Sequence, residues 1–104
     1  GKRLLTLAGD THNAWYTDLT ANGGTLAGRE VAAPSVTSPG FDGVLGSSAV
    51  VLDFFKQALT TLIDDLNYAN ISQRGYANVT FSTSRAVAEW RYVGSITTQT
   101  TSTT

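Results

Sequence analysis

Hydrophobic and polar positions repeat with two periods along this chain, and the clearer one is helical. Between residues 48 and 66, apolar side chains recur every three to four positions, as on one face of an amphipathic helix. They are Val50, Val51, Phe54, Phe55, Ala58, Leu59, Leu62 and Ile63, with Asp53, Lys56, Gln57, Thr60, Thr61 and Asp64 on the other side. Ser47 or Ser48 can cap its start. The pattern predicts one long helix that covers a sheet or another helix.

The second pattern is an alternation of apolar and polar residues, and it predicts a hairpin near the end of the chain. Alternation over residues 76–81 and again over residues 86–93 is typical of strands with one buried face. The inward positions are Ala77, Val79 and Phe81 in the first strand, and Ala88, Trp90 and Tyr92 in the second. Residues 83–85 turn the chain between them. We expect Trp90 and Tyr92, together with Trp15, to belong to the core.

The first forty residues carry a weaker pattern. The apolar run of residues 4–8 ends at Gly9 and predicts a central strand buried on both faces. Residues 13–19 favour a short helix that ends at Asn22-Gly23-Gly24. Residues 30–36 have weak strand character, and Pro34 favours an edge or an irregular path. These elements predict an α/β or α+β fold over residues 1–96. Residues 97–104 contain only Thr, Ser and Gln and are predicted to be disordered.

Composition narrows the classes of function. A chain of 104 residues suits one domain, and its net charge of −1, without a basic run, gives no electrostatic reason to bind nucleic acid or an anionic membrane. The longest apolar stretch, residues 49–66, is interrupted by charges, so we expect no membrane span. Cysteine is absent, which excludes disulfides, thiolate zinc sites and a cysteine nucleophile.

Candidate chemistry gathers in Asp10-Thr11-His12-Asn13, which contains the only histidine. In an extended segment, Asp10 and His12 would point the same way, just past a strand end where ligand sites of α/β sheets gather. A carboxylate, an imidazole and an amide oxygen suit hard divalent and trivalent cations. The alternative is structural, because Asp10 or Asn13 can cap a helix and a lone histidine often only packs.

Counting donors limits this hypothesis. A two-metal centre needs about six protein ligands. The chain has one His, no Cys, six Asp and two Glu, most of them on the predicted helix or in other segments. We therefore expect most ligands of such a centre to come from other polypeptide. The chain begins at Gly1 rather than methionine, so we expect it to be a piece of a longer protein.

Three segments in the same order resemble one known family. "LAGDTHNAWYTDL" resembles the C-terminal Gly-Asp-x-His segment of the PhoD-like alkaline phosphatases, a branch of the calcineurin-like metallophosphoesterases. "REVAAPSVTSPGF" is similar to the strand and Ser-Pro-Gly loop that follow in that family. "ISQRGYANVTFSTSRAVAEWRYV" resembles its closing block, in which Arg-Gly-Tyr leads a strand, a turn and a second strand. Together they cover about residues 4–94.

The resemblance implies the C-terminal portion of a layered sandwich of two sheets flanked by helices, with metal ions, calcium and iron in the family, at the strand ends. It implies an enzyme that hydrolyses phosphate mono- or diesters outside the cytoplasm. Asp10 would be a metal ligand, and His12 a ligand or a catalytic donor to the phosphate. Asn13 would support them. Arg74 would contact phosphate or brace the start of its strand.

The upstream half of the family's metal site is not in this chain. The resemblance therefore implies a C-terminal fragment of a metal-dependent phosphatase or phosphodiesterase, inactive alone, whose main partner is the N-terminal part of the same polypeptide. The alternative is a non-catalytic α+β interaction module. In either case, exposed apolar surface on residues 4–8 or 50–63 would favour self-association.

Overall fold

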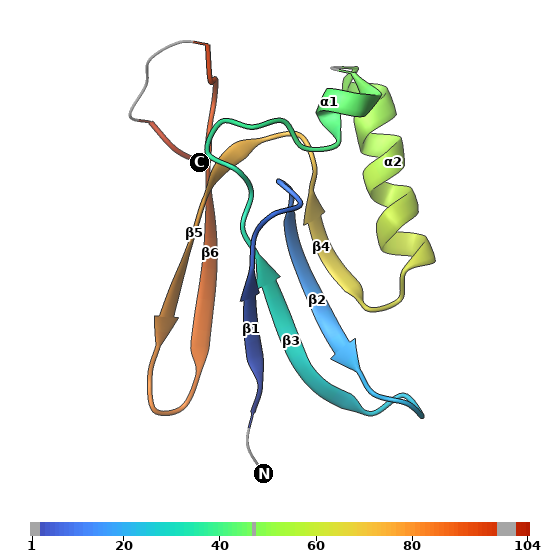
Figure 1. Cartoon of the computed structure of the whole chain (residues 1–104), viewed down its shortest axis with the longest axis vertical. Coiled ribbons are helices and arrows are strands. Elements are labelled where there is room, and N and C mark those ends of the chain that lie inside the picture. Colours follow the sequence, from blue (N-terminus) through green and yellow to red (C-terminus); the bar gives the residue numbers. More distant parts are fainter. Residues whose placement is uncertain (1–2, 47, 98–101) are drawn as a thin grey trace.

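Two sheets and one main helix make up the computed structural model, which describes residues 3–46, 48–97 and 102–104 (Figure 1). The larger sheet contains β1 (Leu5–Ala8), β2 (Ala14–Thr20), β3 (Leu26–Ala32) and β4 (Leu66–Asn70) in the order β1-β3-β2-β4. A hairpin of β5 (Arg74–Phe81) and β6 (Ala86–Val93) forms the second sheet, and the helices are α1 (Asp42–Leu45) and α2 (Ala49–Leu62). Of the two classes that the sequence left open, the fold is α+β.

Strand directions bring several loops to one edge of the larger sheet. β1 is parallel to β3, whereas β2 is antiparallel to both β3 and β4. β1, β3 and β4 therefore run the same way, and their carboxyl ends meet the start of β2 at the upper edge in Figure 1. Because β3 separates β1 from β2, the connection over residues 9–13 must cross the end of β3.

Two predictions for the first forty residues are wrong. β1 is an edge strand rather than a central one, and Leu7 is 59% exposed. Its apolar composition suits a strand between two neighbours, but only one neighbour, β3, pairs with it among the described residues. Residues 14–20 form β2 instead of a helix, because pairing with β3 and β4 on both sides outweighs the local preference. Gly23 and Gly24, both with positive φ, close the turn into β3 rather than ending a helix.

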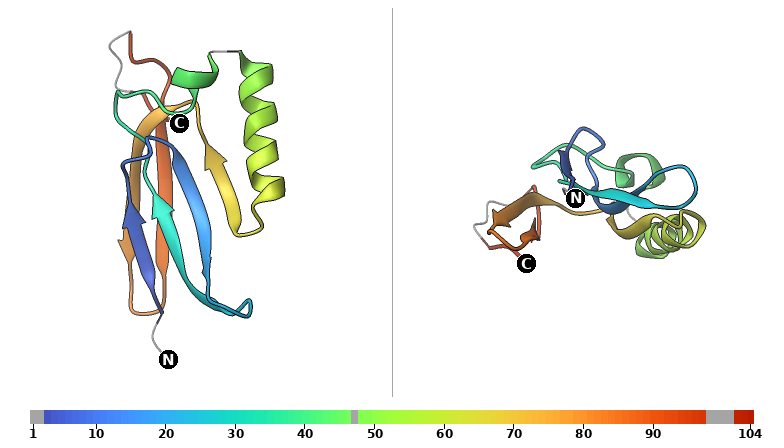
Figure 2. Two further views of the ribbon diagram at one scale, coloured as in Figure 1. Left: turned by 45° about the vertical axis from the view of Figure 1, so that its right-hand side comes forward. Right: turned by 90° about the horizontal axis from the view of Figure 1, so that it is seen from below.

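The predicted hairpin is confirmed, including most of its inward face. Ala77 lies opposite Trp90, and Val79 lies opposite Ala88. The Trp90 indole contacts the rings of Tyr16 and Tyr68 at centroid distances of 6.3 and 5.1 Å. These contacts place the hairpin beside the larger sheet, as the turned views in Figure 2 show. Phe81, at the turn end, is 64% exposed and departs from the prediction.

The two faces of β2 carry different aromatic contacts. Trp15 and Tyr16 are consecutive, so their side chains point to opposite faces of the sheet. Trp15 contacts Phe41 at 6.0 Å, and Phe41 contacts Phe55 of α2 at 5.3 Å. Tyr16 instead faces Trp90 of the hairpin. Trp15 and Trp90 are half-buried, whereas Tyr92 is buried, so only Tyr92 belongs fully to the core.

The long helix is confirmed, but its apolar stripe is not covered as predicted. α2 follows Ser48 and ends at Leu62, because Ile63 is extended and leads toward β4. Leu52 is buried, whereas Val50, Phe54 and Leu62 are 80%, 75% and 81% exposed. Much of the predicted apolar face is thus exposed rather than covered. None of the described helices is both long and apolar enough to cross a bilayer.

Pro34 is buried and lies beyond β3, which ends at Ala32, in agreement with the irregular path predicted there. The predicted disorder of the tail falls largely on residues 98–101, which lie outside the described residues. At the end of the chain, Thr103 bridges Val93, and Thr104 exchanges two backbone hydrogen bonds of 2.7 Å with Tyr92.

Candidate functional site

The candidate site lies at the upper edge of the larger sheet in Figure 1, where three connections meet. Residues 9–13 cross the end of β3, residues 33–41 lead from β3 to α1, and residues 71–73 join β4 to β5. The backbone N–H of Ala33 donates to Ala8 O at 2.9 Å, which ties the ends of β1 and β3 together beneath the crossing. The sheet thus sets the position of the Asp-x-His segment.

The backbone of this segment is bent rather than extended. Asp10 and His12 both have a φ of 62°, and Thr11 N donates to Gly9 O at 2.6 Å. Left-handed backbone at a residue other than glycine is uncommon, although Asp and His accept it better than most, and it costs about 1–3 kcal/mol each. The expectation that Asp10 and His12 converge because they are two positions apart in an extended segment is therefore wrong in its premise. A shared metal remains a prediction.

His12 is held in one tautomer by a backbone carbonyl. Its Nδ1 lies 3.0 Å from Pro39 O, across a sequence separation of 27 residues. A carbonyl oxygen can only accept, so Nδ1 carries the hydrogen and Nε2 of the neutral ring keeps its lone pair. Metal-binding histidines have this arrangement, in which the ring nitrogen that does not bind metal donates to a carbonyl or carboxylate. Asp10 is exposed, and its carboxylate has no hydrogen bond to any described residue.

Asn13 connects the Asp-x-His segment to the same neighbouring loop. It is only 2% exposed; its Nδ2 donates to Thr11 O at 2.7 Å, and its Oδ1 accepts from Phe41 N at 3.1 Å. Gly40 is needed at this contact, because a Cβ there would lie 2.8 Å from His12 O and would also overlap Asn13 Oδ1. The partners of the Asn13 side chain are backbone groups, and the supporting role predicted for this residue stays a prediction.

Arg74 enters the site region through an acidic residue that sequence analysis missed. The guanidinium is 6% exposed, its Nη2 donates to both carboxylate oxygens of Asp42, and its Nη1 donates to Gln73 O at 3.3 Å. Asp42 Oδ1 also accepts from Gly40 N at 2.9 Å. A buried arginine needs an acidic partner, and Asp42 adjoins the Ser-Pro-Gly block. That reasoning could have identified Asp42 from the sequence.

His12, Asn13 and Arg74 therefore all connect to residues 39–42, which we call the clamp loop. Pro39 accepts from His12, Phe41 donates to Asn13, and Asp42 pairs with Arg74. The fourth predicted residue, Asp10, lies outside this network. The structure thus brings three of the four predicted residues to one loop, which the sequence analysis described only as the Ser-Pro-Gly loop of the family.

Few side chains of this region could hold a metal ion. In the described segments, no group of three or more His, Asp or Glu side chains lies close enough to hold an ion. Asp42 is occupied by Arg74, so Asp10 and the free nitrogen of His12 are the donors that this loop region offers. That donor set fits two ligands of a larger centre and does not fit a complete one.

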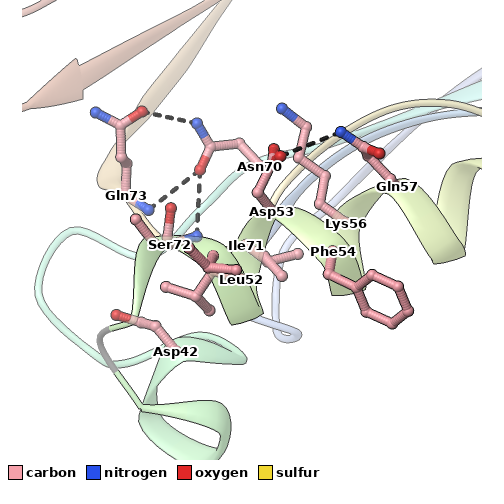
Figure 3. Close-up of a pocket in the computed structure, with 12 residues that line it drawn as sticks. Asp42, Leu52, Asp53, Phe54, Lys56, Gln57, Asn70, Ile71, Ser72 and Gln73 are labelled. Carbon is pink, nitrogen blue, oxygen red and sulfur yellow. Dashed lines mark hydrogen bonds between the residues drawn. The ribbon is translucent and has the colours of Figure 1, made fainter.

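An open hollow lies on the α2 side of the clamp loop (Figure 3). Its walls come from the first half of α2 and from the connection between β4 and β5, with Asp42 at one end. The polar groups in it are paired with one another: Gln57 donates to Asp53 at 3.1 Å, and Asn70 donates to Gln73 at 2.8 Å. Of the charged side chains in the lining, Asp42 pairs with Arg74 and Asp53 accepts from Gln57, whereas the ammonium group of Lys56 has no partner among the described residues.

A family model described as PhoD-like phosphatase matches residues 1–90, a range that includes the Asp-x-His segment, the clamp loop and Arg74. No curated protein and no solved structure matches the chain.

Proposed function

The chain belongs to the PhoD-like phosphatase family, and on that premise we propose that it supplies the Gly-Asp-x-His segment of a metal-dependent phosphatase. The family is one of phosphate-ester hydrolases, and it implies a requirement for metal. The tautomer of His12 carries the proposal, because its hydrogen bond to Pro39 O leaves Nε2 as a lone-pair donor. Two strained residues in one short segment agree with a functional role, since such strain collects at active sites.

In this proposal, Asp10 and His12 are two ligands of a centre that further polypeptide completes. Bound cations supply charge neutralisation at the phosphoryl oxygens and lower the pKa of a bound water. His12 is the proposed catalytic residue of this chain: from its fixed ring the lone pair of Nε2 binds the centre, whereas donation to a phosphate oxygen, the other role that the resemblance implies, would need a hydrogen on Nε2. Asn13 supports the segment by holding Thr11 O and Phe41 N.

The remaining features of the enzyme follow from the family resemblance and are part of the proposal. The chain would be the C-terminal part of a calcineurin-like metallophosphoesterase domain that uses calcium and iron, cleaves phosphate mono- or diesters and works outside the cytoplasm. Its principal partner would be the N-terminal part of the same polypeptide. Alone, it would be inactive, because the donors found near His12 are too few for a metal centre.

The test measures hydrolysis of a chromogenic phosphate ester by the intact phosphatase that contains this chain, with metal added. We expect Asp10→Asn and His12→Ala each to lower turnover at least ~100-fold, as loss of a catalytic group does. Asp64→Asn, which changes an exposed carboxylate beyond the end of α2, is the matched control and should leave turnover unchanged. Full turnover in His12→Ala would overturn the catalytic role. Stoichiometric metal in the isolated 104-residue chain would overturn the shared centre.

The second candidate is an interaction module without catalysis, and the exposed side chains of Val50, Phe54 and Leu62 on α2 favour it. Turnover and association, measured on the same set of variants, distinguish the two candidates. A module predicts that α2 substitutions abolish association while His12→Ala is silent, whereas the phosphatase proposal predicts loss of turnover in His12→Ala without loss of association.

A further inference from the structure

We infer that the Asp42–Arg74 ion pair is a positioning device for His12 and that Arg74 acts through Asp42 rather than by touching substrate. The inference deepens the proposed function, on which the use made of His12 rests. The positioning itself concerns only residues of this chain. The inference gives Asp42 a role and replaces the phosphate contact that was one of the two roles expected of Arg74.

The first step is that the clamp loop determines the tautomer of His12. Pro39 O lies 3.0 Å from Nδ1, and no other hydrogen bond orients the ring in the described chain. If Pro39 moved by a fraction of an ångström to an ångström, this bond would lengthen beyond hydrogen-bonding distance. The imidazole would then be free to place its hydrogen on either nitrogen, and Nε2 would no longer be reserved as an acceptor.

The second step is that Asp42 holds the clamp loop in shape. Its Oδ1 accepts from Gly40 N at 2.9 Å, one residue beyond Pro39. Its carboxylate also pairs with Arg74, and its own N–H donates to Ile71 O at 3.4 Å. Asp42 therefore ties the loop to the start of β5 through its side chain and to the β4–β5 connection through its backbone N–H.

The third step is that Arg74 is a rigid anchor. It is the first residue of β5 and is 6% exposed, and the neighbouring Gly75 N donates to Ser35 O at 3.0 Å. Its Nη2 contacts both oxygens of the Asp42 carboxylate and its Nη1 donates to Gln73 O, so two nitrogens of one planar group fix the direction of the side chain. These contacts give the buried guanidinium a role that needs no phosphate.

The test reads the tautomer of His12 directly. His12 is the only histidine, so nitrogen NMR of the labelled chain gives one pair of imidazole signals. All spectra are recorded at one alkaline pH, so that the tautomer ratios of the variants are compared under the same conditions. We expect the Nδ1–H form to predominate in the wild type. In Asp42→Asn and in Arg74→Gln, we expect the ratio of Nδ1–H to Nε2–H to fall about five-fold, the effect of one ordinary hydrogen bond.

The control breaks a more exposed ion pair elsewhere. Asp18→Asn removes the partner of Arg29, whose Nε lies 3.1 Å from Asp18 Oδ1 between β2 and β3, and it should leave the ratio at the wild-type value. A wild-type ratio in a folded Asp42→Asn or Arg74→Gln variant overturns the inference, as does a wild-type ring that is mainly Nε2–H. Folding is judged by near-ultraviolet circular dichroism of the tryptophans.

If Asp42→Asn and Arg74→Gln both fail to fold, the same measurement on Arg74→Lys tests the positioning. Lysine keeps the charge but lacks the fork, so a lowered ratio supports positioning and an unchanged ratio overturns it. The measurement uses neither metal nor substrate. A lowered tautomer ratio in Asp42→Asn and Arg74→Gln, together with full turnover in His12→Ala of the intact enzyme, would reject the proposed function and support the positioning. An unchanged ratio in those two variants, together with lost turnover in His12→Ala, would reject the positioning alone.

Discussion

Asn13 shows at the scale of one residue why an amide stands at this site. Its Nδ2 donates to Thr11 O while its Oδ1 accepts from Phe41 N, and the side chain is almost fully buried. A carboxylate of the same size could accept from Phe41 but could not donate to Thr11, and alanine could do neither. The residue therefore links two loops through functions that only an amide combines.

We expect Asn13→Ala to lower the free energy of unfolding by about 1–3 kcal/mol, because it removes a buried side chain and leaves Thr11 O and Phe41 N without its part-buried hydrogen bonds. Urea unfolding followed by tryptophan fluorescence measures the change. Asn67→Ala is the control, since Asn67 is exposed and makes one hydrogen bond of 3.5 Å to Asp65 O. Equal stability of the Asn13 and Asn67 variants would contradict this account.

At the scale of elements, the hairpin is joined to the larger sheet by a pair of phenols. The hydroxyl groups of Tyr68 on β4 and Tyr92 on β6 lie 2.6 Å apart, and Trp90 Nε1 donates to Ala32 O at 3.0 Å. Burial raises the pKa of Tyr92 well above its ordinary value, and the hydrogen bond with Tyr68 adds to the rise. The folded state therefore holds the Tyr92 proton more tightly than the unfolded state does.

This difference sets the direction of a pH effect. A raised pKa contributes stability that is fully present below ~10, the ordinary pKa of tyrosine, and is lost as pH rises above it. We expect Tyr92→Phe to be less stable than the wild type near neutral pH, where the phenol pair is lost, and to lose less stability between neutral and strongly alkaline pH. Urea unfolding over a pH series measures both.

The matched control for this prediction is Tyr76→Phe. Tyr76 lies on β5 with 44% of its surface exposed. Tyr76→Phe therefore removes one phenol hydroxyl, as Tyr92→Phe does, but leaves the Tyr68–Tyr92 pair in place. Its alkaline profile should follow that of the wild type. If the profile of Tyr92→Phe also coincided with that of the wild type, the buried phenol would have no part in alkaline unfolding.

The whole molecule is more extended than its length requires. Its radius of gyration is 14.9 Å, against ~13 Å for a compact domain of about 100 residues. Large apolar side chains remain exposed on α2 and on β1, among them Val50, Phe54 and Leu7. An apolar surface of this kind usually contacts another protein surface. It agrees with a chain that packs against further polypeptide.

We predict that the isolated 104-residue chain self-associates through α2. In sedimentation velocity, the average mass of the wild type should rise with concentration, and Phe54→Glu should shift it toward the monomer because a charge would be buried in the contact. Thr61→Glu adds the same charge at another exposed position of α2 and should leave the association unchanged. A wild type that stays monomeric at every concentration would contradict the prediction.

The sequence predicted those features of the site that depend on neighbours along the chain. The Asp10-Thr11-His12-Asn13 segment was identified from residue types alone, and three ordered blocks indicated the family that the match over residues 1–90 now shows. The arrangement of the site was beyond such reasoning. His12 meets Pro39 across 27 residues, and Arg74 meets Asp42 across 32. Both contacts depend on the strand order, and no local pattern encodes it.

The same division holds for the fold. The spacing of hydrophobic positions was enough to predict α2 and the β5–β6 hairpin. An apolar stripe on a helix and alternation along two neighbouring strands are both properties of a short segment. Only the tertiary structure decided that residues 14–20 form a strand and that β1 lies at an edge, since both depend on which segments pair with them. Strand pairing is made by hydrogen bonds between distant segments. Its free energy outweighs the small local preference of seven residues for a helix.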